Sequence, residues 1–219
     1  MLHRGRSTSL AEKLSSSGRP GAGESRGNLP THMIGAKREA GEAVLAKDPE
    51  EEIVRLLMPS PIGRLAIEFR GTVVTRLVVQ PSRREAKNFR SLDKIQLTDF
   101  LMEALGRLSE YFAGVRSDPE INVDLSGSDL DAFQRRVLKE VRRVPYGKSW
   151  SYKKLAEASG RRTAYNLVRS VLSMNPIPIL IPCHRVLPTK GGAGAWIGGT
   201  KKKERLLRIE KKGLELETQ

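Results

Sequence analysis

The only cysteine in the 219-residue chain is followed directly by a histidine. Cys183 and His184 lie within residues 176–186, where three prolines and an apolar run precede the thiol. A histidine beside a cysteine is a common way to generate a thiolate near neutral pH. We therefore expect Cys183 to be a nucleophile at the mouth of a buried segment.

The composition excludes several classes of protein. A single cysteine rules out an internal disulfide framework and a cysteine-cluster metal site. The three histidines, His3, His32 and His184, are too few and too scattered for zinc, so we expect no metal. No apolar run approaches the roughly 18 residues of a membrane-spanning helix, and the N-terminus lacks the apolar core of a secretory signal. We expect an intracellular protein without a membrane partner.

The net charge of +14 is concentrated towards the C-terminus. Residues 1–50 hold 8 basic and 6 acidic side chains, residues 51–130 hold 11 and 12, and residues 131–219 hold 20 and 7. The last segment, which also contains the cysteine, therefore carries +13. A basic segment with a reactive thiol indicates a polyanionic partner, and we favour nucleic acid over a merely solvated basic face.

The patterning predicts an α+β protein whose first ordered part is a small domain. Residues 1–50 are rich in Ser, Gly, Arg and Glu and are expected to be a disordered extension. An N-terminal domain is expected over residues 51–120. Short β-branched runs separated by Gly and Pro predict an antiparallel meander there, followed by a helix over residues 97–114. The Asp-, Ser- and Gly-rich residues 115–130 are the expected boundary between the two parts.

The second part is expected to be mostly helical, over residues 128–213, with a tail at 214–219. N-cap candidates at 128–131 precede a helix that ends near Val144. Two short helices, 152–159 and 163–174, are joined by a turn that contains Gly160, and together they form a helix-turn-helix candidate. A glycine-rich loop at residues 190–199 contains Trp196, and Thr200 can cap a final helix over residues 201–211.

An ordered set of motifs resembles the O6-alkylguanine-DNA alkyltransferases, the methylated-DNA–protein-cysteine methyltransferase family. The match is close over residues 133–213 and looser over residues 53–114. It rests on these segments, in the family's order: Phe133-Gln134, Val144-Pro145-Tyr146-Gly147, Ser151-Tyr152, Asn175-Pro176, Pro182-Cys183-His184-Arg185-Val186, Gly198-Gly199 and Lys203-Glu204 with Leu206-Leu207 and Glu210.

The resemblance implies a DNA repair reaction in which Cys183 takes the alkyl group from guanine O6 once and irreversibly, without a cofactor. His184 is then the base towards Cys183 through a bridging water, and Glu210 orients the imidazole. Tyr152 corresponds to the tyrosine that donates its hydroxyl proton towards guanine N3. O4-alkylthymine is a further substrate that the resemblance leaves open.

The resemblance also implies how the base is held. The carbonyls of Cys183 and Val186 are expected to accept from the guanine amino group, and the backbone N–H of Ile197 is expected near O6. Trp196 corresponds to an aromatic wall of the pocket. Asn175 corresponds to a buried hinge between the helix-turn-helix and the cysteine segment.

The chain departs from the family on the helix expected to enter the minor groove. Asn166 stands where the family has an arginine that fills the gap left by the flipped nucleotide. Arg169 stands where a glycine is usual, and Tyr165 where a small residue is usual. These three side chains and Arg185 are the expected DNA contacts, and Tyr165 could stack as a wedge.

Three other functions remain open from the sequence. An alkyltransferase-like protein would bind the lesion without removing the alkyl group, but such proteins usually lack the cysteine. A transcription regulator would use the helix-turn-helix, and a cysteine hydrolase would need an oxyanion site and turnover. The expected partner is double-stranded DNA containing O6-alkylguanine, bound by a monomer. The expected location is the cytoplasm (nucleoid) of a prokaryote or the nucleus of a eukaryote.

Overall fold

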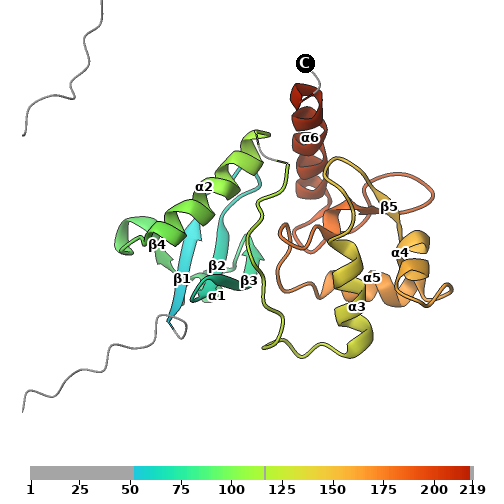
Figure 1. Ribbon diagram of the computed structural model, residues 1–219, viewed down its shortest axis with the longest axis horizontal. Helices are drawn as coiled ribbons and strands as arrows, with labels where there is room; N and C mark the ends of the chain where they lie inside the picture. The colour runs from blue at the N-terminus through green and yellow to red at the C-terminus, as the bar shows by residue number, and fades with distance from the viewer. Residues whose placement is uncertain (1–51, 116, 218–219) are drawn as a thin grey trace, which may run out of the picture. The chain divides into compact units, whose positions relative to one another are not determined.

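The computed structural model describes residues 52–115 and 117–217. The extension predicted for residues 1–50 lies outside them. The first described part is a four-stranded sheet in the order β3-β2-β1-β4 (Figure 1). Its strands are β1 (Ile53–Met58), β2 (Leu65–Arg70), β3 (Val73–Val79) and β4 (Arg90–Ser91). The first three strands pair antiparallel, so the predicted meander is confirmed.

Three short elements after β3 were not predicted. They are α1 (Arg83–Ala86), the edge strand β4, which pairs parallel with β1, and the 3-10 helix η1 (Leu92–Lys94). Helix α2 (Asp99–Ala113) then begins at Thr98, whose side chain accepts a hydrogen bond from the Leu101 N–H. It ends at Gly114, which adopts a left-handed φ of 74°. The predicted helix over 97–114 is therefore confirmed within two residues at its N-terminal end.

Helix α2 packs its apolar stripe against the sheet. The Phe100 ring meets the Phe69 ring of β2 edge to face, with 5.9 Å between their centroids. The segment that follows α2 is bonded to β3: the Val74 N–H donates to the Asn122 carbonyl, and the Asp124 N–H donates to the Val74 carbonyl. Ile121 in this segment is buried in the core. The connection predicted over residues 115–130 is thus hydrogen-bonded to β3, an edge strand of the sheet.

The remaining elements are mostly helical. They are α3 (Ala132–Val141), β5 (Trp150–Ser151), α4 (Tyr152–Ala158), α5 (Tyr165–Ser173), η2 (Cys183–Arg185), β6 (Val186–Leu187) and α6 (Thr200–Glu217). Asp131 caps α3 in a capping box with Gln134, and Ser151 caps α4. Helices α4 and α5 contact each other in the positions predicted for a helix-turn-helix. The α+β fold class predicted from the sequence is confirmed.

Helix α6 continues beyond the predicted end. It was expected to stop at residue 211, followed by a tail at 214–219, but the helix runs to Glu217. Gly213 lies within this helix, at a position where an added Cβ would overlap the Tyr146 hydroxyl oxygen. Leu214 then packs against the core. The glycine permits close helix packing here and does not act as a C-cap.

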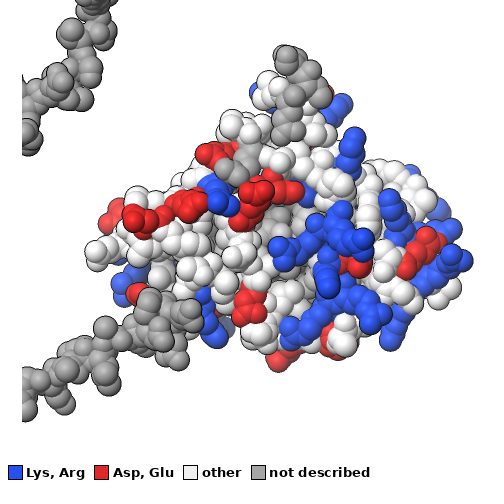
Figure 2. Space-filling model, in the orientation of Figure 1, with Lys and Arg blue, Asp and Glu red and all other residues white. Residues whose placement is uncertain are grey.

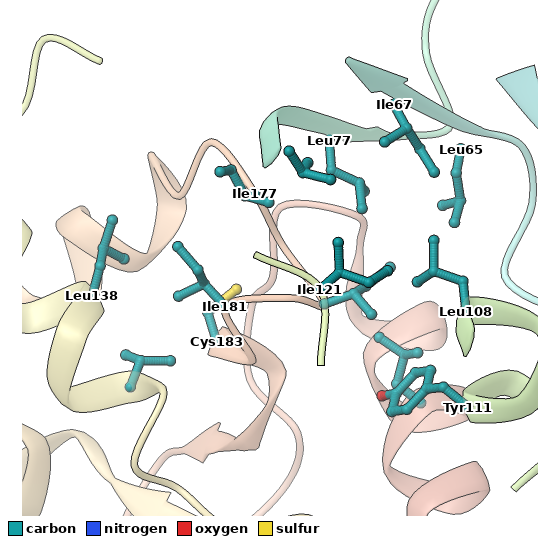
Figure 3. Packing of buried hydrophobic residues seen from close by; sticks show 14 of the residues in the cluster. Leu65, Ile67, Leu77, Leu108, Tyr111, Ile121, Leu138, Ile177, Ile181 and Cys183 are labelled. Carbon is teal, nitrogen blue, oxygen red and sulfur yellow. The ribbon is translucent and has the colours of Figure 1, made fainter. Parts of the chain in front are cut away.

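One cluster of buried side chains runs through both the sheet and the helical elements (Figure 3). Ile121 lies between Leu108 of α2 and Ile181 of the cysteine segment in this view. A hydrogen bond from the Leu77 N–H to the Pro176 carbonyl, 2.9 Å long, also joins β3 to the residues that lead to the cysteine. The domain boundary near residues 120–128 stays a prediction. Among the described residues, no helix is both long and apolar enough to cross a membrane.

Candidate active site

Cys183 begins a 3-10 turn and is buried, with 2% of its surface exposed. Its N–H donates to the Ile181 carbonyl at 2.7 Å, and its Sγ accepts from the Trp196 Nε1–H at 3.1 Å. The next residues form β6, which pairs parallel with β5 at the start of the helix-turn-helix. The cysteine is therefore part of a tight turn that leads directly into a short strand.

Burial raises the pKa of the Cys183 thiol. Hydrogen bonds from Asn175 and Trp196 and the positive charge of Lys203 act in the opposite direction. No direct hydrogen bond joins Cys183 to His184 among the described residues. Adjacency in the sequence therefore does not by itself produce the thiolate, and other groups must assist.

Glu210 of α6 is the centre of a buried hydrogen-bond network. Its carboxylate accepts from the Tyr111 hydroxyl at 2.7 Å, from the Arg185 Nε–H at 3.1 Å to each oxygen, and from the Gly147 N–H at 3.1 Å. The His184 Nε2 lies 2.7 Å from Glu210 Oε1. Burial alone would raise the pKa of Glu210, but interaction with His184, the charge of Arg185 and the hydrogen bond from Tyr111 lower it to about 2.

The network fixes the tautomer of His184. Burial lowers the pKa of His184, and although the neighbouring Glu210 opposes this, we take the imidazole to be neutral at neutral pH. Arg185 already balances the charge of Glu210. A neutral imidazole can bond a carboxylate only by donating, so Nε2 carries the proton. The Nδ1 atom then holds the free lone pair, and it has no hydrogen-bond partner among the described residues.

Arg185 was expected to contact DNA, and its burial contradicts this. Only 1% of its surface is exposed. Besides Glu210, the guanidinium donates to the Val144 carbonyl at 2.8 Å and to Asp118 at 2.7 Å. The charge of Arg185 is therefore neutralised inside the protein. Through these contacts Arg185 links the segment after α2 to the active-site turn. This arginine holds the site together and does not face a phosphate.

Asn175 braces the approach to the cysteine, as expected for a buried hinge. It is 1% exposed. Its Nδ2 donates to the Ile181 carbonyl at 2.9 Å, and its Oδ1 accepts from the Ile177 N–H at 3.0 Å. Between these anchors Ile179 adopts a φ of 79°, which costs a β-branched residue about 1–3 kcal/mol. The side chain of Asn175 therefore stabilises a turn that the backbone would not favour alone.

A cavity beside Cys183 is lined by side chains from both helices of the helix-turn-helix, the glycine-rich loop and α6. Its volume is only about 10 Å³, and its lining includes Tyr152, Arg169, Trp196, Ile197 and Lys203. A neighbouring groove of about 570 Å³ shares Tyr152 and Arg169 with it. The small cavity cannot hold a purine as it stands.

The predicted pocket residues lie together, but their exposure differs. The Val186 side chain is fully buried, and its carbonyl oxygen accepts from the Lys203 Nζ at 2.6 Å. Trp196 is half-buried, whereas the Ile197 side chain is 47% exposed. Burial raises the pKa of the Tyr152 hydroxyl, although the charge of Arg169 opposes this. Tyr152 therefore stays protonated and can donate.

The predicted DNA-facing residues of α5 border the larger groove. Tyr165, Asn166 and Arg169 line it, and Tyr165 is 53% exposed. Figure 2 shows Lys and Arg side chains gathered over the part of the surface that contains α3, α4 and α5, while acidic side chains gather over α2. On the face shown, the exposed positive charge thus gathers over the helix-turn-helix.

Two buried polar residues of the site were missed in the sequence. Tyr111 lies in the helix predicted over residues 97–114 and was given no role there, although a buried tyrosine hydroxyl needs a partner. Lys203 was quoted in a motif without a role. Its spacing from Leu206, Leu207 and Glu210 places it on the buried face of α6. No cluster of three metal-ligating side chains occurs within the described residues.

Comparison with known proteins identifies the family. Residues 132–212 match the family model for the "6-O-methylguanine DNA methyltransferase, DNA binding domain". A methylated-DNA–protein-cysteine methyltransferase of Mycobacterium leprae is 36% identical over 154 residues, covering 70% of this chain and 90% of that protein. A Methanosarcina barkeri protein of the same name is 35% identical over 122 residues, covering 56% of this chain and 75% of that protein.

Solved structures agree with the sequence relatives. The Mycobacterium tuberculosis O6-methylguanine methyltransferase has a TM-score of 0.63 and 31% identity, with 75% of this chain and 99% of that chain covered. The same organism's OGT in complex with DNA has a TM-score of 0.62 and 31% identity, with 73% and 93% covered. The chain belongs to the methylated-DNA–protein-cysteine methyltransferase family.

Proposed function

We propose that this chain repairs DNA by transferring the alkyl group of O6-alkylguanine to Cys183, once per protein molecule. One observation carries the assignment of the nucleophile. The chain's sole cysteine lies at a cavity lined by both helices of the helix-turn-helix, next to a buried histidine–glutamate pair. O4-alkylthymine has the same type of alkyl–oxygen bond and is a second substrate to test.

The buried residues support a displacement in which every proton is accounted for. The Cys183 thiol passes its proton, through water, to the free Nδ1 of His184. The thiolate sulfur forms a bond to the alkyl carbon, and the bond from that carbon to guanine O6 breaks. The electron pair stays on the guanine, whose N3 takes a proton from Tyr152. The imidazolium left on His184 balances the tyrosinate left at Tyr152, and both return to their neutral forms by proton exchange with water. The products are a thioether on Cys183 and an unmodified guanine, so the protein is consumed.

The alkylated base must leave the duplex to reach the sulfur. Flipping costs a few kcal/mol, and the basic surface around α5 provides phosphate attraction that offsets it. Tyr165 is exposed at the start of α5 beside the groove. We propose that its ring stacks in the gap left by the flipped base, with Arg169 one turn away contacting the backbone. A nucleoid or nuclear location follows from the substrate.

The experiment is a label-transfer assay. The full chain is incubated with a duplex oligonucleotide that carries O6-[methyl-labelled]guanine, and label on protein is counted against moles of chain. We expect one label per chain, and none with Cys183→Ala. Tight lesion binding by the wild-type chain without any transfer would instead support an alkyltransferase-like lesion-binding protein.

A further inference from the structure

Lys203 places a buried ammonium group at the cavity of the reactive cysteine. It projects from α6, is 1% exposed, and lines the same small cavity as Cys183. Its Nζ donates to the Val186 carbonyl oxygen at 2.6 Å. Within the described residues this is its one hydrogen-bond acceptor, and no carboxylate there lies within ion-pair distance. Two of its three N–H donors therefore lack a protein partner.

A buried ammonium without a counter-anion is costly. Burial lowers the pKa of Lys203 to about 8, and Cys183 is the neighbour whose charge acts in the opposite direction. In turn, the charge of Lys203 is among the influences that lower the pKa of Cys183. An anion that forms on the sulfur would therefore relieve the cost of keeping Lys203 charged.

The other charged groups near Cys183 are unsuited to be this partner. Arg185 is paired with Glu210 and Asp118. Burial keeps His184 neutral, so it can take a proton but does not start as a cation. Arg169 and Tyr152 face the cavity from α5 and α4; the charge of Arg169 acts on Tyr152, and the arginine is exposed to solvent.

We propose that Lys203 supplies the positive charge that stabilises the Cys183 thiolate, while its hydrogen bond fixes the Val186 carbonyl at the wall of the base pocket. A carbonyl oxygen has two lone pairs, so Val186 can hold Lys203 and still accept from a bound base. This inference rests on the proposed function, because the thiolate is the nucleophile of that reaction. Lys203 acts through Cys183 and Val186, and is thus a positioning residue.

The test uses the fact that Cys183 is the sole cysteine. The ultraviolet absorbance of the thiolate is titrated with pH in the full chain, and the curve of the Cys183→Ala variant is subtracted. The same titration is done for Lys203→Met, Lys203→Arg and the matched control Lys201→Met, which removes an exposed lysine from the same helix. Single-turnover methyl transfer from duplex O6-methylguanine is measured in parallel.

We expect Lys203→Met to raise the pH of half-ionisation of Cys183 by about one unit and to slow transfer near neutral pH about tenfold. Lys203→Arg should keep a profile close to wild type, and Lys201→Met should be unchanged. An unchanged titration in folded Lys203→Met would overturn the proposal. If that variant fails to fold, as judged by thermal unfolding, Lys203→Gln keeps a donor for Val186 and decides the question.

The two proposals fail in different ways. Failure of the wild-type chain to accept methyl from DNA would rule out the proposed function. The thiolate titration would still show whether Lys203 affects the ionisation of Cys183. A wild-type chain that transfers methyl normally, with a titration insensitive to Lys203, would remove only this inference.

Discussion

The active-site turn and the outer face of α5 hold their side chains in opposite ways. His184, Arg185 and Glu210 are each at most 1% exposed and share hydrogen bonds of 2.7–3.1 Å. On α5, Tyr165 is 53% exposed. No hydrogen bond or ion pair involves the side chains of Tyr165, Asn166 or Arg169 within the described part of the chain. Both regions border the cavities around Cys183.

This contrast indicates that the buried network carries out the alkyl transfer, whereas α5 brings the damaged DNA to it. A buried hydrogen-bonded network is preorganised, so removing one member leaves another polar group unsatisfied. Exposed side chains on α5 are free to adapt to a duplex, and each contributes modestly to the affinity for DNA. Substitutions in the network should therefore damage folding or the reaction itself, whereas substitutions of Tyr165 and Asn166 on α5 should change only how well DNA is engaged.

The largest effect is expected from removing Arg185. Arg185→Met leaves the buried Glu210 carboxylate without its cation and should lower the free energy of unfolding by about 3–5 kcal/mol. The control Arg162→Met removes an arginine whose side chain is 84% exposed. Urea unfolding measures both. If Arg185→Met lost less than about 1 kcal/mol but weakened DNA binding, the interior role assigned to Arg185 would be wrong.

Glu210 should make stability depend on acid pH. Its pKa in the folded protein is about 2, below the ordinary 4.5. A lowered carboxyl pKa stabilises the fold above the unfolded value, and this contribution is lost as pH falls from about 4.5 to about 2. Its size is roughly 3 kcal/mol.

Glu210→Gln should remove that pH dependence and be less stable at neutral pH. Urea unfolding at a series of pH values from 7 down to acid measures the free energy of unfolding of each variant. Glu103→Gln, which changes an exposed side chain, is the control. A wild-type curve with the same acid slope as Glu210→Gln would contradict the placement of this charge.

On α5, Tyr165→Ala should weaken binding to duplex DNA with the lesion by about tenfold, because a stacked aromatic is worth about 1–3 kcal/mol. Leu167→Ala is the matched control, since Leu167 is 42% exposed on the same helix but does not line the groove. Fluorescence anisotropy measures both. Equal effects of the two variants would argue against stacking by Tyr165.

The smallest effect is expected from Asn166→Arg. An added cation should strengthen duplex binding a few-fold and steepen its logarithmic salt dependence by about one unit. Ser170→Arg, at another exposed position of the helix, controls for charge alone. No change in the transfer rate on duplex DNA would mean that Tyr165 or Arg169 already fills the gap.

Much of this arrangement could be predicted from the sequence. The apolar periods gave the three antiparallel strands and the helices, and the motifs brought Cys183, His184 and Glu210 together. The strands β4, β5 and β6 have two residues each, too few for a hydrophobic period. Such strands depend on tertiary contacts that no local pattern records.

The errors concern residues whose partners lie far away in the sequence. Arg185 was expected at DNA because its charge suits phosphate, but the same charge suits Glu210, 25 positions later. Tyr111 bonds Glu210 across 99 positions, which a helix period cannot indicate. The last helix was expected to end at residue 211, because the close packing of Gly213 against Tyr146 is visible only in three dimensions.

The most direct test compares two substrates for each variant. Methyl transfer is measured from free O6-methylguanine base and from a duplex that carries the same lesion. Substitution of His184 or Lys203 should slow both reactions by the same factor, whereas Tyr165→Ala should slow only the duplex reaction. A Tyr165→Ala variant that is equally impaired on the free base, or a His184 variant impaired only on duplex DNA, would contradict the separation of chemistry from delivery.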